Sequence, residues 1–391
     1  MKKLAIVTTH PIQYNAPWFK LLTENGKVLP KVFYTWGQLQ VENKFDPGFG
    51  KSIKWDIPLL EGYQYIFVKN IASNPGSHHR NGIINPSLIY EIEQWQPDAV
   101  LVFGWNFISH LKCIKYFHKK KPVFFRGDST LIDETKGLKA IIRHVFLKWV
   151  YSYIDIALYV GIENKAYYKA LGLKENQLCF APHAIDNNRF MINSFVSGRE
   201  KLGISKDAVV FLFSGKFESK KNPLLLMEAF IQLNTPKAYL VMVGNGELEK
   251  QLKNIAAGLK DDLKKRIHFL PFQNQMEMPN IYRICDVLVL PSQGPGETWG
   301  LAVNEAMACN KAVLVSDKCG CVADIVKNGI NGYSFKNRNL EDLLYKMNLL
   351  LIDSERLKKM GDQSSDIIQK YNYEKICTVI ENSLLSIVQI S

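Results

Sequence analysis

The sequence predicts an α/β fold built from two doubly wound, Rossmann-like domains. Short apolar runs with strand character alternate with segments of helical period along the whole chain, which is typical of βαβ units and parallel sheets. The length of 391 residues exceeds that of a typical single domain, and the hydrophobic content of 47% suffices for two packed cores. The alternation is interrupted once, close to the middle of the chain, which favours two domains over one.

The expected strands form two groups, one in each half of the chain. In the first half they are residues 4–8, 31–35, 99–103, 122–125, 155–160 and 177–181. In the second half they are residues 209–214, 239–243, 267–270, 286–290 and 312–316. Doubly wound sheets bind ligands at the carboxyl ends of their strands, so we expect the functional residues to follow these runs directly.

The domain boundary is placed where the alternation breaks. Residues 182–190 are irregular, the chain stays polar to about residue 205, and a new strand pattern then begins. We therefore expect a first domain over residues 1–187, a linker over 188–205 and a second domain over 206–370. Residues 371–391 have helical period and are expected to form a separate C-terminal helix.

Charge and cysteine content limit the classes of partner. The net charge of +12 and the pI of about 9.1 favour an anionic partner: a nucleotide, an anionic lipid surface, a phospholipid-linked acceptor or nucleic acid. No nucleic-acid-binding motif appears, so we expect no nucleic-acid partner. The seven cysteines are scattered and odd in number, which argues against a disulfide framework. Cys319 and Cys321 form the one close pair, and no second pair with zinc-site spacing accompanies them.

Neither a signal peptide nor a membrane span is predicted. The first apolar run stops at Val7, too early for the core of a secretory signal. No run approaches the roughly 18 apolar residues that a spanning helix needs. We therefore expect a cytoplasmic protein that can dock peripherally on the inner face of the cell membrane.

Residues 291–308 are the most informative segment for function. They follow an apolar strand and comprise a loop rich in glycine and proline and then a helix-period run. Such a helix N-terminus, with its unpaired N–H groups, is suited to a phosphate. Glu297 and Glu305, eight positions apart, would repel phosphate but can bind sugar hydroxyls by charge-assisted hydrogen bonds. Phosphate and hydroxyl groups in one site point to a nucleotide-sugar.

Two lysines follow the first strand of the second half. Lys216 and Lys221 could stabilise a departing diphosphate by meeting its developing charge in a dry site, and Lys220 is the adjacent alternative. No Asp-x-Asp cluster for a divalent ion is found, so lysines without a metal are favoured and no cofactor is expected. The other interpretation of this pair is two solvated surface lysines.

The segment with Glu297 and Glu305 resembles the Glu-x7-Glu motif of the retaining glycosyltransferases of family 4. These enzymes have the GT-B fold, in which two Rossmann-like domains face a central cleft. Further matches occur in the expected order at residues 211–222, 240–246, 267–272, 311–320 and 324–332, so residues 205–335 resemble the family densely. Residues 182–186 also resemble the interdomain segment of the family, with Ala184 where glycine is usual. The resemblance implies that the last helix crosses back onto the first domain.

The resemblance also implies roles for the donor-site residues. Glu305 would bind the ribose hydroxyls, and Glu297 would contact the transferred sugar near the reacting centre. Backbone N–H groups around Trp299, Gly300 and Leu301 would hold the diphosphate. The remaining donor-binding positions that match the family are Gly215, Gly244, Pro271 and Phe272.

The first half departs from the family in two places. The loop after residues 4–9 lacks the usual glycines and offers His10, Gln13 and Tyr14 as candidate acceptor contacts. Arg126 and Asp128 stand where the family has a histidine: Arg126 is a candidate acceptor contact, and Asp128 could orient an acceptor hydroxyl or act as a base. A structural role for His10 and a structural Arg126–Asp128 pair are the alternatives.

Residues 136–151 form a predicted amphipathic helix with cations beside apolar side chains. With the lysines at 119–121, this helix could lie on an anionic bilayer. The alternative is an ordinary helix that packs its apolar face on a sheet.

The expected activity is transfer of a hexose or amino-sugar from a nucleotide-diphosphate-sugar to an acceptor hydroxyl, with retention of configuration. The acceptor would be a surface polysaccharide or a lipid-linked glycan. An epimerase of the same fold that acts on a UDP-amino-sugar is the second enzyme class. A non-catalytic basic binding protein is the third interpretation.

Overall fold

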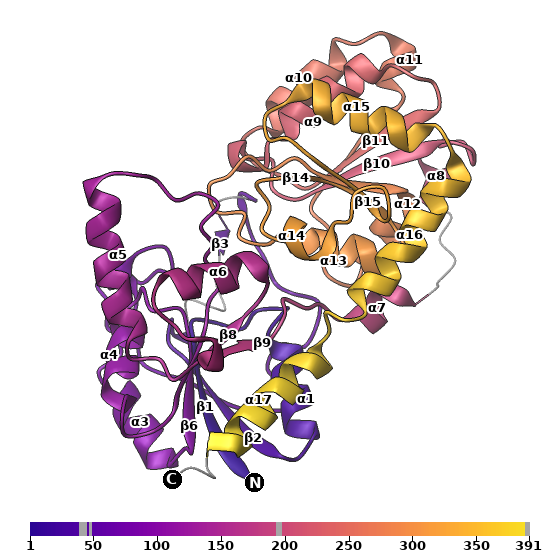
Figure 1. Cartoon of the computed structure of the whole chain (residues 1–391). Coiled ribbons are helices and arrows are strands. Elements are labelled where there is room, and N and C mark those ends of the chain that lie inside the picture. The colour runs from indigo at the N-terminus through magenta and orange to yellow at the C-terminus, as the bar shows by residue number, and fades with distance from the viewer. Residues whose placement is uncertain (39–44, 47–48, 193–197, 388–391) are drawn as a thin grey trace. The chain divides into compact units, whose positions relative to one another are not determined.

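The computed structural model describes residues 1–38, 45–46, 49–192 and 198–387 (Figure 1). The chain forms two compact units. The first comprises Met1–Lys44, Ile57–His183 and Tyr373–Ser391, and the second comprises Phe45–Asp56 and Ala184–Asn372. Each unit contains one parallel sheet with helices, which confirms the predicted fold class of two Rossmann-like domains.

The first unit is built on a seven-stranded parallel sheet in the order β5-β2-β1-β6-β7-β8-β9. Its strands are β1 (Lys2–Thr8), β2 (Val28–Tyr34), β5 (Gln64–Phe67), β6 (Ala99–Phe103), β7 (Val123–Arg126), β8 (Ile156–Tyr159) and β9 (Leu178–Phe180). The central strands are fully buried because helices cover both faces, and this explains their continuous apolar runs.

Helices form most of the connections in the first unit. They are α1 (Ala16–Glu24), α3 (Leu88–Trp95), α4 (Ile108–Phe117), α5 (Leu138–Tyr151) and α6 (Ile162–Ala170), with short 3₁₀ turns at Arg80–Gly82 and Glu175–Gln177. Aromatic side chains fill much of one core, where Tyr151 and Tyr168 pack against Phe125, and Tyr167 packs against both of these tyrosines.

The second unit contains a six-stranded parallel sheet in the order β12-β11-β10-β13-β14-β15. Its strands are β10 (Val209–Ser214), β11 (Ala238–Val243), β12 (Ile267–Leu270), β13 (Val287–Leu290), β14 (Ala312–Ser316) and β15 (Gly332–Phe335). A separate two-stranded antiparallel ladder joins β3 (Phe45–Asp46) and β4 (Lys51–Ser52).

Helices connect the strands of the second unit on both faces (Figure 1). They are α7 (Asn187–Met191), α8 (Gly198–Lys201), α9 (Pro223–Leu233), α10 (Glu249–Ala257), α11 (Asp261–Lys264), α12 (Met278–Ile284), α13 (Leu301–Ala308), α14 (Val322–Ile325), α15 (Leu340–Leu351) and α16 (Ser354–Ile368), with a 3₁₀ turn at Ser219–Lys221. One core joins β10, β11 and β13 to α9, α10, α15 and α16.

Every expected strand is present, and its bounds differ by only a few residues. The two-residue strands β3 and β4 were not expected from the sequence, and neither were β5 and β15. Both β5 and β15 are short edge strands, and polar residues or glycine interrupt their apolar pattern. The boundary between the units lies between His183 and Ala184. Helices α7 and α8 fall largely within the predicted linker. Residues 193–197 of that linker lie outside the described part of the chain. The segment Phe45–Asp56 belongs to the second unit although it comes from the first half of the chain.

The C-terminal helix α17 (Tyr373–Ile387) is part of the first unit and packs on α1. Its buried face includes Ile376, Ile380 and Leu384, at the spacing of an amphipathic helix. The buried carboxylate of Glu381 accepts hydrogen bonds from Asn25 Nδ2 (2.8 Å) and Lys27 Nζ (3.1 Å). These contacts tie the end of the chain to its first helix.

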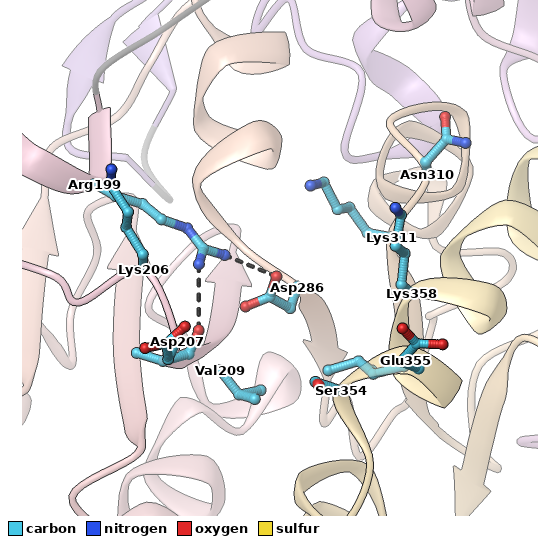
Figure 2. Close-up of a pocket in the computed structure, with 12 residues that line it drawn as sticks. Arg199, Lys206, Asp207, Val209, Asp286, Asn310, Lys311, Ser354, Glu355 and Lys358 are labelled. Carbon is cyan, nitrogen blue, oxygen red and sulfur yellow. Dashed lines mark hydrogen bonds and ion pairs between the residues drawn. The ribbon is translucent and has the colours of Figure 1, made fainter.

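A pocket of about 440 Å³ lies at the amino ends of β10, β13 and β14 (Figure 2). Arg199 spans it: its guanidinium donates to Asp286 Oδ1 at 2.7 Å and to the carbonyls of Ile284 and Ala208. Asp286 Oδ2 in turn accepts the backbone N–H of Val210 at 2.8 Å. This network aligns the starts of β10 and β13, and none of the described residues that line the pocket is a predicted donor-site residue.

The packing of α17 predicts a selective effect of truncating Ile380. We expect Ile380→Ala to cost about 2–5 kcal/mol, because a fully buried side chain is removed and a cavity remains. Leu385→Ala, on the exposed side of the same helix, should change stability by less than about 0.5 kcal/mol. Urea unfolding followed by circular dichroism measures both. Equal effects of the two changes would contradict the assigned packing of α17.

Candidate functional site

The strand order of the second sheet reverses between β10 and β13. These two strands are neighbours, with Phe211 opposite Val287 and Leu212 opposite Leu288, although β11 and β12 lie between them in sequence. Doubly wound sheets bind nucleotides in the crevice outside such a reversal point, at the carboxyl ends of the strands. Gly215 and Lys216 follow β10, and residues 291–300 follow β13, so the structure brings the predicted lysine and glutamate segments to this point.

Hydrogen bonds join the two loops at the reversal point. The backbone N–H of Gln293 donates to the carbonyl of Lys220 at 2.8 Å, and Gln293 Nε2 donates to the carbonyl of Ser219 at 2.7 Å. Arg338 Nε donates to Gln293 Oε1 at 2.9 Å. The position of the lysine turn therefore depends on the loop that carries Glu297.

Lys221 and Glu297 form an ion pair across the reversal point. Lys221 Nζ binds Glu297 Oε2, and the same oxygen accepts a hydrogen bond from Ser292 Oγ at 2.8 Å. The Glu297 residue is only 9% exposed, so its charge is held in a largely dry environment. Lys220 instead points to Glu218, at 3.6 Å, and its side chain is 45% exposed. These contacts favour Lys221 over Lys220 as the second lysine of the site.

Glycines allow the loops of the second unit to lie close together. A Cβ on Gly320 would lie 1.8 Å from the carbonyl oxygen of Thr298, and the Gly320 N–H donates to the carbonyl of Glu297 at 3.0 Å. Gly244, at φ +139°, lies against Gly215, whose carbonyl oxygen would be 2.0 Å from an added Cβ. Side chains at either position would displace the loops that bear Glu297 and Lys216.

Cys319 and Cys321 flank Gly320 and are buried. Burial raises the pKa of both thiols, which keeps them protonated and poorly reactive. Their placement agrees with a packing role in a tight loop.

Glu305 lies in α13, which begins directly after Gly300 at φ +106°. The side chain is buried, and Glu305 Oε2 accepts a hydrogen bond from the hydroxyl of Tyr282 at 2.8 Å. Trp299 Nε1 donates to Asn304 Oδ1 at 2.8 Å, which fixes the entry into the helix. Tyr282 was missed by sequence analysis because it lies in α12, remote in sequence from the motif.

Pro271 and Phe272 follow β12, at the same carboxyl edge. The backbone N–H of Phe272 donates to Asn245 Oδ1 at 3.0 Å, which links this loop to the Gly-x-Gly turn after β11. Lys216 Nζ lies 5.1 Å from the centre of the Phe49 ring. The predicted donor-binding residues of the second unit thus all lie at or after the carboxyl ends of its strands.

In the first unit, the strand order reverses between β1 and β6. His10 follows β1 there: its Nδ1 lies 2.8 Å from Thr9 Oγ1, and its ring packs edge-on against Trp36 at 5.1 Å. Gln13 and Tyr14 lie in the half-buried turn before α1. The structure therefore places these three predicted acceptor contacts at the reversal point of the first sheet.

Arg126 and Asp128 have different surroundings. The buried guanidinium of Arg126 donates to the carbonyls of Ala181 at 2.7 Å and Pro182 at 2.9 Å, so it holds the chain after β9 in place. Burial lowers its pKa to about 10, which leaves it charged at neutral pH. Asp128 is half exposed, and its Oδ2 lies 3.7 Å from Nε2 of His183, whose pKa burial lowers.

His110 is a buried polar residue that the sequence analysis did not select. Its Nε2 lies 2.8 Å from Thr35 Oγ1, and its Nδ1 lies 2.9 Å from the carbonyl oxygen of Phe103. Burial lowers its pKa to about 4, so the ring is neutral and serves to link β6 to the turn after β2. The position of His110 near the start of an apolar helix is the feature of the sequence that could have identified it as a buried polar residue.

The described residues contain neither a metal-binding cluster nor a membrane-spanning helix. Among them, no group of three or more His, Cys, Asp or Glu side chains could hold a metal ion. Within the same residues, no helix is long and apolar enough to cross a membrane.

One family model matches part of the second unit. Residues 197–366 match the family described as Glycosyl transferases group 1. The lipopolysaccharide 1,2-N-acetylglucosaminetransferase of Salmonella typhimurium is 32% identical over 195 residues, which are 48% of this chain and 50% of that protein. The N,N'-diacetylbacillosaminyl-diphospho-undecaprenol α-1,3-N-acetylgalactosaminyltransferase of Campylobacter jejuni is 28% identical over 255 residues, or 62% and 64% of the two chains. The chain thus spans between about half and two thirds of these relatives.

Solved structures extend the similarity of fold to the whole chain. HepE of Anabaena, in complex with UDP and glucose, superposes with a TM-score of 0.70 at 18% identity and covers 99% of this chain and 100% of its own. WaaG, a glycosyltransferase involved in lipopolysaccharide biosynthesis, gives a TM-score of 0.66 at 14% identity over 97% and 99% of the two chains. Residues 197–366 of this chain therefore match the family of glycosyl transferases group 1, and the whole chain shares its fold with HepE and WaaG.

Proposed function

We propose that this chain is a retaining, metal-independent glycosyltransferase. It would move a hexose or amino-sugar from a nucleotide-diphosphate-sugar to a hydroxyl of a surface polysaccharide or lipid-linked glycan. The observation that carries the proposal is the ion pair of Lys221 and Glu297, with Lys216 in the loop after β10, at the reversal point of a sheet in a segment that matches a glycosyltransferase family. The acceptor class is supported by the lipopolysaccharide and undecaprenol-linked substrates named for the relatives.

In this proposal, the two lysines stabilise the departing nucleotide diphosphate. Breaking the anomeric bond transfers negative charge to the diphosphate, and fixed cations in a dry site lower that barrier. Before a ligand binds, the charge of Lys221 is balanced by Glu297. A bound diphosphate would therefore share the ammonium group of Lys221 with the carboxylate of Glu297. This arrangement could replace a divalent cation, and insensitivity to EDTA tests that point.

The glutamates would bind the sugars. Glu297 would hold a hydroxyl of the transferred sugar, and Glu305, fixed by Tyr282, would hold the ribose hydroxyls. Asp128, half exposed beside His183, would orient or deprotonate the acceptor hydroxyl, and His10, Gln13 and Tyr14 would contact the acceptor. Arg126 would support this side through its hydrogen bonds to backbone carbonyls. The anomeric proton coupling in the NMR spectrum of the product measures whether configuration is retained.

Peripheral membrane contact through α5 is the second part of the proposal. Ile141, Ile142 and Val145 are 61%, 62% and 63% exposed, and Leu138 and Trp149 extend the same stripe at helical spacing. Of this helix, only its last turns reach the core, through Leu147, Val150 and Tyr151. Lys139, Arg143 and Lys148 lie among the exposed apolar groups, as in helices that rest on anionic bilayers.

Donor binding is tested by thermal stabilisation of the purified chain with UDP-, GDP-, ADP- and CMP-linked sugars, each with and without EDTA. We expect one nucleotide class to raise the melting temperature, because ligand binding to the folded state stabilises it. EDTA should leave this shift unchanged, and Lys221→Met should abolish it. The absence of a shift with every nucleotide-sugar would contradict the proposed donor site.

The two glutamates should differ in their kinetic effects. Glu305→Ala should raise the KM for the donor strongly, because binding is lost equally in the ground and transition states. Glu297→Ala should mainly lower kcat, by roughly a hundredfold or more. Tyr282→Phe should raise KM by up to about tenfold, the value of one lost hydrogen bond, whereas exposed Tyr345→Phe should have no effect. Small, equal effects of both glutamate changes would refute these roles.

The membrane contact is tested by flotation with vesicles of phosphatidylcholine containing phosphatidylglycerol. Paired changes Lys139→Glu and Arg143→Glu should reduce binding by roughly tenfold or more, since each basic residue near an anionic surface contributes about 1 kcal/mol. The matched pair Lys358→Glu and Lys359→Glu, exposed on α16, should leave it unchanged. Equal loss in both pairs would indicate only a nonspecific charge effect and would contradict docking through α5.

A further inference from the structure

The segment that contains Phe49–Asp56 lies in the second unit, although the residues before Phe45 and after Asp56 belong to the first unit. Phe45–Asp56 is part of the compact unit that contains the predicted donor residues. Of this stretch, residues 45–46 and 49–56 are described, and β3 and β4 form its antiparallel ladder. The sequence does not predict that this segment joins the second unit, because it resembles none of the motifs found in the second half of the chain.

Hydrogen bonds fix the segment to the loop between β12 and α12. Asn274 Nδ2 donates to the carbonyl of Lys54 at 2.7 Å, and the backbone N–H of Met276 donates to the carboxylate of Asp56 at 3.1 and 3.2 Å. Both partners lie within a few residues of Phe272, at the carboxyl edge of the second sheet. The segment therefore occupies a defined place at the edge where the reversal point lies.

Three aromatic rings gather where the segment meets this loop. The centres of the Phe49 and Phe272 rings are 4.7 Å apart in an edge-on arrangement, and those of Trp55 and Phe272 are 6.3 Å apart. All three side chains are only half-buried. We call Phe49, Trp55 and Phe272 the aromatic cluster.

The aromatic cluster contacts Lys216, which is predicted to bind the diphosphate. The ammonium group of Lys216 lies 5.1 Å from the centre of the Phe49 ring, within the range of a cation–π contact. Lys216 follows β10 and Phe272 follows β12, two strands away, so about 10 Å separates the two strand ends. This is about the length of a nucleoside between its base and its phosphates.

We propose that the aromatic cluster, completed by Phe49 and Trp55 from the first half of the chain, is the surface on which the donor nucleobase stacks. Flat aromatic faces bind bases through stacking, and Lys216 beside them is placed for the phosphates of the same nucleotide. Phe49 and Trp55 would then act as specificity-determining residues for the base. This inference rests on the proposed function and adds to it the part of the chain that recognises the base.

The test compares ligands with and without a base. Isothermal titration calorimetry measures UDP, GDP, ADP and inorganic pyrophosphate with the full chain and with the variants Phe49→Ala, Trp55→Ala and Phe49→Trp. Phe49→Ala should weaken the preferred nucleoside diphosphate by roughly fivefold to a hundredfold, the range of base–aromatic stacking. Pyrophosphate binding should change by less than about threefold, within the variation of a weak exposed contact.

Two further variants make the expected result specific. Phe49→Trp keeps an aromatic face and should restore binding, and Trp55→Ala should weaken nucleoside diphosphates without affecting pyrophosphate. Tyr345→Ala, an exposed aromatic residue on α15, is the matched control and should leave all affinities unchanged. Melting temperatures of the unliganded variants show whether they remain folded.

Three results would contradict the proposal, and they can be distinguished from one another. Equal weakening of the binding of nucleoside diphosphates and pyrophosphate would overturn base stacking. It would mean that Phe49 acts only through its contact with Lys216. Unchanged or tighter nucleotide binding in both Phe49→Ala and Trp55→Ala would also overturn base stacking, because the segment would then only cover the edge. A wild-type chain that binds pyrophosphate and no nucleotide would contradict the proposed function itself, and the inference with it.

Discussion

The parallel pairing of β10 with β13 is the constraint on which the candidate donor site depends. It places two loops from distant parts of the sequence side by side, one with the lysines and one with Glu297. The pairing is held at both ends. Arg199 and Asp286 align the amino ends, and Gln293 joins the loops at the carboxyl ends. A shift of either strand would separate Lys221 from Glu297.

The electrostatics of the site follow from that constraint. A largely buried carboxylate is costly unless it is paired, and Glu297 is paired with Lys221 and also accepts a hydrogen bond from Ser292. Because the pair is held by its loops, its groups are already oriented when an anion arrives. Preorganised charge of this kind is effective in stabilising negative charge that develops during a reaction.

The two units use their polar residues differently at corresponding places. In the first unit, Arg126 and His110 are buried and bonded to backbone carbonyls, so they maintain the loops after β6, β7 and β9. Its more exposed groups are Asp128 at the carboxyl edge and the apolar stripe of α5. In the second unit, the charged groups of Lys221 and Glu297 pair with each other at the reversal point itself.

The sequence by itself determined the fold class and most strands of both sheets, and it predicted the segments of the candidate donor site. Buried parallel strands must be continuous apolar runs, and the loops after them need glycine, so both features can be recognised locally. Only the tertiary structure decided which lysine meets Glu297, that Tyr282 fixes Glu305, and that Arg126 holds backbone carbonyls. It also placed Phe49–Asp56 beside Phe272. These are contacts between residues far apart in the chain, and neither composition nor periodicity specifies which distant side chains will meet.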